Sequence, residues 1–190
     1  MITNRQNSFI ATLKLDDQHV DFLGQLHGTP ALRNDRIFSG GFFTGAPTVR
    51  DDSHLLGCRS TQEIPMHAPL TAYFRCTDDY YHLYIRSHPT YTGHCISKSP
   101  QKVLGAYLPD DGDTTSFNLM SLENRIVTLR EMKGGIQRVR LKARNSKAIG
   151  IIRRKGAPYL YLSEIDGEGV VFKLRIIERN ASFLSNPDEI

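Results

Sequence analysis

Hydrophobic and polar residues alternate with a period of two along much of the chain, and the 3.6-residue period of an amphipathic helix is scarce. Such alternation places apolar side chains on one face of a strand. It predicts two hairpins, namely 71–76 with 80–86 across the turn 77–79, and 126–131 with 136–144 across the turn 133–135. Gly and Asp at these tips suit tight turns. We therefore expect an all-β fold.

A short motif occurs twice, 55 residues apart. Asp111-Gly112-Asp113 is followed after three residues by Phe117-Asn118-Leu119, and Asp166-Gly167-Glu168 is followed at the same spacing by Phe172-Lys173-Leu174. The predicted hairpins extend the repeat, because Phe74 falls on Leu129 at the same offset. A weaker third copy begins at Ala11, 61 residues before Ala72. A repeat of this length predicts similar structural units that pack on one another.

Three units, each of four short strands, predict a closed object, because so small a unit cannot bury its apolar face alone. Closure also removes exposed sheet edges. In this architecture the chain resembles the β-trefoil superfamily, with its fascin-like, lectin-like and growth-factor-like members. The resemblance implies one domain over 1–190, with a six-stranded barrel, three hairpin caps and units at about 1–68, 69–123 and 124–190. The Gln-x-Trp motif of ricin-type lectins is absent, since the chain has no Trp.

Composition narrows the cellular setting. With 190 residues and 39% hydrophobic content, the chain is large enough to bury a core. No apolar run approaches the roughly 20 residues of a membrane span, and the N-terminal residues lack the layout of a signal peptide. Cys58, Cys76 and Cys95 form no CxxC pair, so no disulfide framework is expected. These features predict a cytoplasmic protein, or one secreted without a signal peptide, that has no transmembrane segment.

Positive charge is concentrated in one window. From Arg130 to Lys155 there are ten Lys and Arg against one acid, a net +9 in a chain whose total is +4. Between 138 and 144, four cations alternate with three apolar residues, which predicts a strand with the charges on its outward face. Such a face attracts phosphate, sulfate or carboxylate groups. The predicted binding residues are Arg138, Arg140, Lys142, Arg144, Lys147, Arg153, Arg154 and Lys155. The alternative is a solvated face that discourages edge-to-edge association.

The acidic residues of the repeated turns are a second candidate site. Asp111, Asp113, Asp166 and Glu168 could accept hydrogen bonds from sugar hydroxyls or bind a hard cation. Their spacing does not match an EF-hand. A purely structural interpretation is that Asp-Gly makes the turn while the following phenylalanine fills the core.

Other chemistries have weaker support. His67, His82, His88 and His94 lack the close spacing typical of metal ligands, although His94 adjoins Cys95. The chain has neither a nucleophile elbow nor a phosphate-binding Gly-rich loop. No aromatic residue lies between Arg130 and Lys155 to stack on nucleic-acid bases. We expect no cofactor, no metal and no nucleic-acid partner.

The leading hypothesis is a non-enzymatic, lectin-like binding module. It would recognise glycans through surface loops, and the basic strand would favour acidic or sulfated ones. The first alternative is a protein-interaction module, such as an effector, toxin-targeting or inhibitor domain, that binds an acidic protein surface. The second is an enzyme with a pocket that contains His and Cys.

Overall fold

A computed structural model describes residues 4–35, 48–109 and 114–182. Within these ranges the chain is all-β, as expected from the alternation. The helical segments are α1 (Asn4–Asn7), α2 (Leu23–His27) and the single 3-10 turn η1 (Pro89–Tyr91). The strands are β1 (Phe9–Lys14), β2 (Gln18–Phe22), β3 (Leu32–Asp35), β4 (Thr48–Asp51), β5 (Leu56–Ser60), β6 (Leu70–Thr77), β7 (Tyr80–Ile85), β8 (Cys95–Lys98), β9 (Leu104–Tyr107), β10 (Phe117–Met120), β11 (Ile126–Val127), β12 (Ile136–Ala143), β13 (Ala148–Arg153), β14 (Leu160–Ile165) and β15 (Val171–Arg179).

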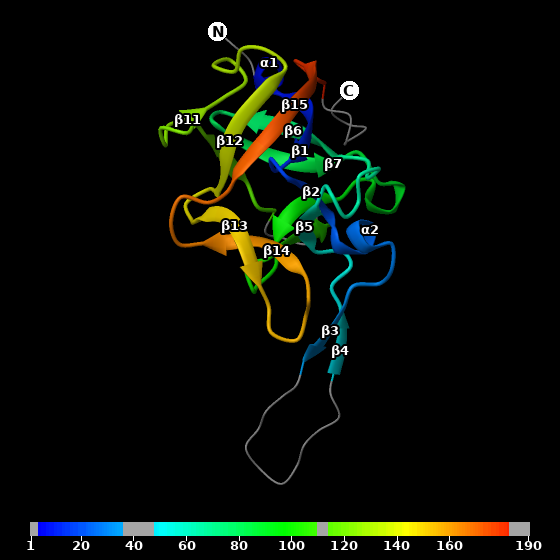
Figure 1. Ribbon diagram of the computed structural model, residues 1–190. Coiled ribbons are helices and arrows are strands. Elements are labelled where there is room, and N and C mark those ends of the chain that lie inside the picture. The colour runs from blue at the N-terminus through cyan, green and yellow to red at the C-terminus, as the bar shows by residue number, and fades with distance from the viewer. Residues whose placement is uncertain (1–3, 36–47, 110–113, 183–190) are drawn as a thin grey trace.

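Six strands pair in a closed cycle. β1 pairs with β6, β6 with β7, β7 with β10, β10 with β12, β12 with β15, and β15 with β1, each pair antiparallel. Three further pairs, β2–β5, β8–β9 and β13–β14, are also antiparallel. These pairs meet one another, since β14 pairs with β5 and single bridges join Leu55 to Gly105 and Val103 to Ser163. In Figure 1, β2, β5, β13 and β14 lie below the labelled strands of the cycle.

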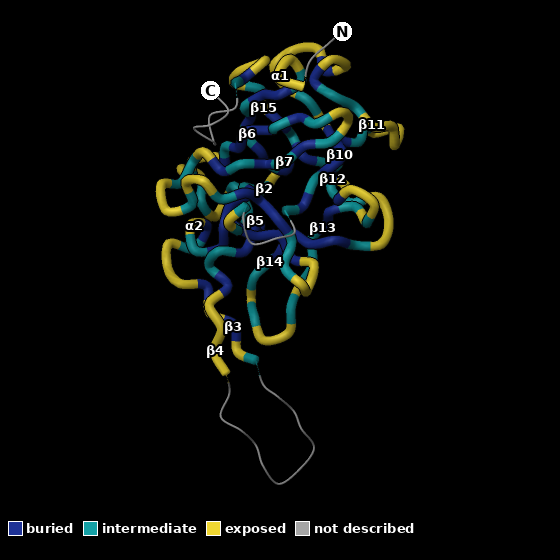
Figure 2. Tube along the Cα trace, turned by 180° about the vertical axis from the view of Figure 1, so that it is seen from behind, coloured by how far each residue is buried: buried dark blue, intermediate teal, exposed yellow. Residues whose placement is uncertain are grey.

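A large apolar core fills the inside of this arrangement, and a second, smaller cluster includes Leu23, Leu26 and Tyr161. The side chains of Phe9, Phe74, Tyr81, Phe117 and Phe172 are all completely buried, and the rings of Phe9 and Phe74 stack with centroids 4.5 Å apart. Figure 2 shows the burial concentrated in the strands of the body, with the exposed positions in the connecting loops. The two phenylalanines of the repeated motif are therefore core residues, which agrees with the structural interpretation of the Asp-Gly turns.

The two predicted hairpins have different outcomes. The first is confirmed, because β6 and β7 pair from Ala72↔Ile85 to Thr77↔Tyr80. The second is wrong, because the strand that begins at Ile126 ends at Val127 and pairs with β10 instead of β12. The next residues form a turn in which the Thr128 amide and hydroxyl both donate to the Glu131 carboxylate at 2.7 Å. That turn places Leu129 and Met132 in the core, so it satisfies the apolar alternation without a strand.

β3 and β4 form a separate two-stranded ribbon that extends away from the body (Figure 1). At its base, the Asn34 amide donates to the carbonyl of Gly156 at 3.0 Å. The buried carboxylate of Asp52 accepts hydrogen bonds from Arg33 Nε at 2.9 Å and from the Tyr161 hydroxyl at 2.8 Å. These contacts tie the ribbon to the loop between β13 and β14 and to β14 itself.

Candidate functional site

The basic strand has the predicted faces. Val139, Leu141 and Ala143 on β12 are buried, whereas the alternating residues Arg138 and Lys142 are exposed and Arg140 is partly buried. β12 lies between β10 and β15 in the cycle, so its inward side chains pack on both neighbours and its outward cations project beside them. The alternation in the sequence therefore predicted this strand and the direction of its charges correctly.

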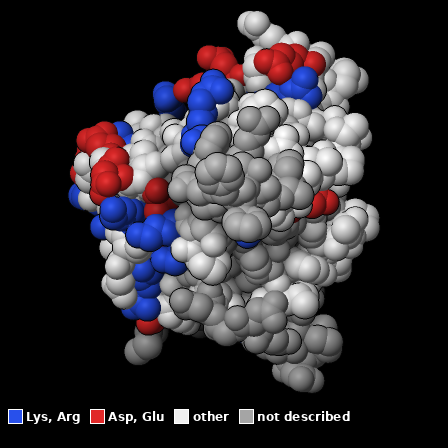
Figure 3. All heavy atoms as spheres, turned by 90° about the horizontal axis from the view of Figure 1, so that it is seen from below, with Lys and Arg blue, Asp and Glu red and all other residues white. Residues whose placement is uncertain are grey.

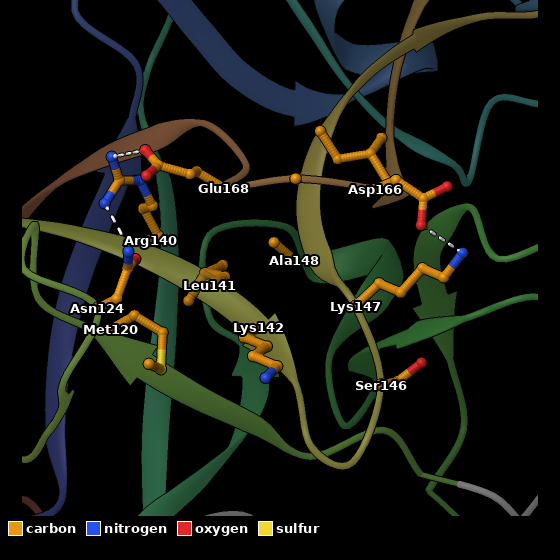
Figure 4. A pocket seen from close by; sticks show the side chains of 12 residues that line it. Met120, Asn124, Arg140, Leu141, Lys142, Ser146, Lys147, Ala148, Asp166 and Glu168 are labelled. Atoms are coloured by element: carbon orange, nitrogen blue, oxygen red, sulfur yellow. Dashed lines mark hydrogen bonds and ion pairs between the residues drawn. The ribbon is translucent and has the colours of Figure 1, made fainter.

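The basic strand and the second acidic turn meet in space. Arg140 Nη2 donates to Glu168 Oε2 at 2.7 Å, and Lys147 Nζ donates to Asp166 Oδ1 at 2.8 Å (Figure 4). The hydrogen bond from Lys147 holds the pKa of Asp166 below its usual value, and the same contact raises the pKa of Lys147. Two groups predicted separately from the sequence thus form one site.

These ion pairs border an open hollow of about 370 Å³. It lies between the end of β12, the turn into β13, and the turn that joins β14 to β15. Figure 4 shows its lining, which combines apolar and charged side chains. The lining residues are Met120, Asn124, Arg140, Leu141, Lys142, Ser146, Lys147, Ala148, Ile165, Asp166, Gly167 and Glu168. The ammonium group of Lys142 makes no hydrogen bond or ion pair with any residue of the described ranges.

Arg140 is the most firmly held cation of the hollow. Its Nη1 donates to the carbonyl of Leu122 at 3.0 Å and to Asn124 Oδ1 at 3.4 Å, while Nη2 binds Glu168. Its side chain is 13% exposed, whereas that of Glu168 is 66% exposed. Arg140 therefore fixes the wall of the hollow, and the carboxylate of Glu168 stays accessible to solvent.

The other predicted basic residues lie outside this hollow. Arg138 pairs with Asp16 at 3.1 Å, and the guanidinium of Arg144 lies over the Tyr80 ring, 4.0 Å from its centroid. Arg154 reaches the Asp52 carboxylate at the base of the ribbon, at 3.4 Å. Arg153, the last residue of β13, and Lys155, in the turn that follows it, are exposed. Figure 3 shows Lys and Arg along one side of the molecule with Asp and Glu among them. Asp111 and Asp113 lie outside the described residues.

A buried cluster of charged and polar side chains was not predicted. Asp21 on β2 is completely buried, and its carboxylate lies 2.7 Å from the Nε2 atoms of both His67 and His88. The amide of Phe22 donates to the same carboxylate at 2.8 Å. The sequence signal was a lone acid in the apolar stretch Val20-Asp21-Phe22, which requires buried partners. Those partners lie 46 and 67 residues away, so spacing could not identify them.

Of the other histidines, His19 adjoins this cluster, because its ring centroid lies 5.4 Å from that of His67. Cys95 is buried with its thiol directed to the carbonyl of Tyr107, and burial raises the pKa of that thiol. Burial also lowers the pKa of His82. Within the described ranges, no group of three or more His, Cys, Asp or Glu side chains is arranged to hold a metal ion. Nor does any helix in these ranges have the length and apolarity to cross a membrane.

Comparisons with protein-family models, with curated proteins and with solved structures give no match to this chain.

Proposed function

We propose that this protein is a non-enzymatic, lectin-like binding module that recognises acidic glycans in the hollow bordered by Arg140, Lys142, Lys147, Asp166 and Glu168. The observation that carries the proposal is the convergence, in one open hollow, of hydrogen-bond donors and acceptors with one cation, Lys142, that has no described partner. Sugar hydroxyls both donate and accept, so they need both kinds of group. The carboxylate or sulfate of an acidic sugar would bind Lys142.

The Lys147–Asp166 ion pair of the hollow is suited to exchange. The Asp166 side chain is 92% exposed and that of Lys147 is 46% exposed. Exposed ion pairs contribute little to stability, because water already solvates both partners. A ligand hydroxyl can therefore take the place of one partner at small cost. The Arg140–Glu168 pair, by contrast, holds the Arg140 side chain in place before a ligand arrives, which reduces the entropy lost on binding.

We propose further that the fold is a β-trefoil. The closed cycle of six strands and the three hairpins that contact one another support this assignment. In this arrangement the units are β1–β2–β5–β6, β7–β8–β9–β10 and β12–β13–β14–β15. The first boundary then falls between Thr77 and Tyr80, whereas the repeat in the sequence placed it after residue 68. The second falls between Met120 and Ile136, an interval that includes the boundary expected after residue 123. β3 and β4 are then an insertion in the first unit, and the glycan hollow belongs chiefly to the third.

One observation favours the protein-interaction alternative. The β3–β4 ribbon carries two exposed apolar side chains, Leu32 at 49% and Val49 at 54% exposure. The exposed cations Arg153 and Lys155 lie at the β13–β14 turn that contacts its base. An apolar ribbon beside basic residues suits an acidic protein surface. The enzyme alternative has no such support, since neither His nor Cys lines the hollow.

A glycan array tests the proposal. We expect binding to sulfated or uronic-acid glycans and none to their neutral counterparts. In solution, Lys142→Ser should weaken binding about tenfold, because a charge-assisted hydrogen bond contributes about 1.5 kcal/mol. Arg153→Ser is the matched control, because it removes one exposed cation outside the hollow and should leave affinity unchanged. An array without signal at high protein concentration, or equal losses in the two variants, would contradict the proposal.

A further inference from the structure

A second hollow lies at the turn between β8 and β9. Its volume is about 380 Å³, and it shares no lining residue with the glycan hollow. Its lining carries ammonium and hydroxyl groups, and no described lining residue is acidic. The lining residues are Ser97, Lys98, Ser99, Pro100, Lys102, Tyr107, Leu108 and Thr114. A concave surface with this composition suits a ligand with several acceptor oxygens and a negative charge.

Lys102 has an unusual backbone for its residue type. Its φ is +66°, in the left-handed region that disfavours side chains other than those of Gly, Asn and Asp. The other non-glycine residues with positive φ in the described ranges are Asp78, Asn124, Asn145 and Asn180, all of the tolerated types. The turn would therefore be more stable with Asn at 102. A strained residue whose type the local structure does not favour is a candidate for function.

The surrounding hydrogen bonds explain how this backbone is held. The Lys102 amide donates to the Ser99 carbonyl at 2.8 Å. The Lys102 carbonyl accepts from the Ser163 hydroxyl at 2.8 Å and from the Glu164 amide at 3.1 Å. All three bonds use backbone atoms of Lys102, so any residue that tolerates this φ could make them. The exposed lysine side chain takes no part in fixing the turn.

Lys98 supplies a second, fixed cation. Its Nζ donates to Glu164 Oε1 at 3.1 Å, and the Glu164 side chain is completely buried. Burial tends to raise the pKa of Glu164, but hydrogen bonds from Ser146 and Lys98 outweigh that effect and keep it below the usual value. The pair therefore holds Lys98 at the wall of the hollow with two N–H groups still available. Glu164 offsets one of the two lysines. Lys102, whose charge also acts on Glu164 and Asp166, supplies the remaining positive charge of the lining.

A hydroxyl group completes the set of donors. Burial raises the pKa of the Tyr107 hydroxyl, which therefore remains a donor at neutral pH. The Ser99 oxygen accepts the Val103 amide at 3.3 Å, and a hydrogen bond from Ser99 to Tyr107 partly offsets the effect of burial on the pKa of Tyr107. The Tyr107 proton is therefore the one that this pair leaves for a ligand. Lys98, Lys102 and Tyr107 thus bring donors to one concave surface. A tetrahedral oxyanion has acceptors in several directions and fits such an arrangement.

We infer that the β8–β9 hollow binds a sulfate or phosphate ester group through Lys98 and Lys102. This inference does not depend on the proposed glycan site, and it holds if the first hollow binds nothing. Both esters carry the same tetrahedral oxyanion, so the geometry defines the group, and the source of that group is decided by experiment.

The test exploits the strained backbone of Lys102. Lys102→Asn should raise the melting temperature by about 2–4 °C, because Asn tolerates a positive φ. It should also weaken anion binding at least about tenfold, because it removes the net charge. Lys102→Gln removes the charge and keeps the strained residue type, so it should lose binding without gaining stability. Lys133→Asn, at an exposed position outside the hollow, is the charge-matched control.

Binding is measured by calorimetry in a low-salt chloride buffer, with inorganic sulfate, inorganic phosphate, a sulfated monosaccharide and a sugar phosphate as probes. Saturable binding of an anion that is lost in both Lys102 variants and kept in Lys133→Asn supports the inference, and the preferred ester identifies the source. Absence of saturation with all four probes, or equal binding by Lys102→Asn and the parent protein, overturns it. A Lys142→Ser variant that still binds the anions separates this site from the glycan hollow.

Discussion

The strongest test of the buried polar cluster is Asp21→Asn. The substitution keeps the size of the side chain but replaces one carboxylate oxygen with a donor. Three hydrogen bonds converge on this carboxylate, at 2.7 Å from His67, 2.7 Å from His88 and 2.8 Å from the Phe22 amide. A hydrogen bond to a charged group contributes about 1.5–3 kcal/mol, and the amide can satisfy only part of the set. We therefore expect a loss of about 2–3 kcal/mol in the free energy of unfolding.

For a chain of this size, 1 kcal/mol shifts the melting temperature by about 2–4 °C, so Asp21→Asn should lower it by about 4–12 °C. Urea denaturation followed by circular dichroism gives the free energy directly. The control is Asp16→Asn, which makes the same chemical change in an exposed pair with Arg138 and should cost less than about 0.5 kcal/mol. The double variant Asp21→Asn, His88→Gln should lose less free energy of unfolding than the sum of the two single variants, because both substitutions break the same Asp21–His88 contact. A loss below about 0.5 kcal/mol in Asp21→Asn would refute the reasoning.

Two further predictions concern stability. Tyr81→Phe should lower the free energy of unfolding by about 1–3 kcal/mol, because the buried hydroxyl accepts the Leu129 amide at 3.0 Å and donates to the Asn7 carbonyl at 3.2 Å. Thermal melts test this, with Tyr84→Phe as the control. Equal melting temperatures of the two variants would count against the prediction. Burial lowers the folded-state pKa of His19, His27, His54 and His82, so the unfolded chain binds more protons below about pH 6.5. The urea concentration at the unfolding midpoint should therefore decrease as the pH is lowered from about 7.5 to about 5. His54→Gln should make this decrease smaller. A midpoint that rises on acidification would show that other groups dominate.

The sequence predicted those parts of the fold that depend on local alternation. β6–β7 and β12 follow the period-two pattern directly, and Phe117 and Phe172 lie in the core as the repeat suggested. The segment after Val127 was predicted to be a strand, but it is a turn whose residues Leu129 and Met132 have buried side chains. A turn can direct apolar side chains into the core much as a strand does. Periodicity alone does not separate these two cases.

The candidate sites were predictable only in part, for a different physical reason. Arg140, Lys147, Asp166 and Glu168 were each singled out, but their pairing depends on how β12 and the β14–β15 turn meet in space. The Asp21 cluster joins three segments that lie far apart in the sequence, with His67 and His88 46 and 67 residues after Asp21, so no motif could identify them. The anion hollow rests on the backbone conformation of Lys102, which its residue type gave no reason to expect. Contacts of this kind arise from the closed fold.

The pairing also changes the meaning of the charge asymmetry. Four of the ten cations in the basic window contact carboxylates from outside it: Arg138 with Asp16, Arg140 with Glu168, Lys147 with Asp166 and Arg154 with Asp52. The field at the surface is therefore weaker than a net +9 suggests, because each such carboxylate offsets its cation at short range. Long-range attraction would make binding steeply dependent on salt. A hollow in which one cation has no partner among the described residues instead predicts a shallow salt dependence, with selectivity set by the positions of donors and acceptors around the sugar.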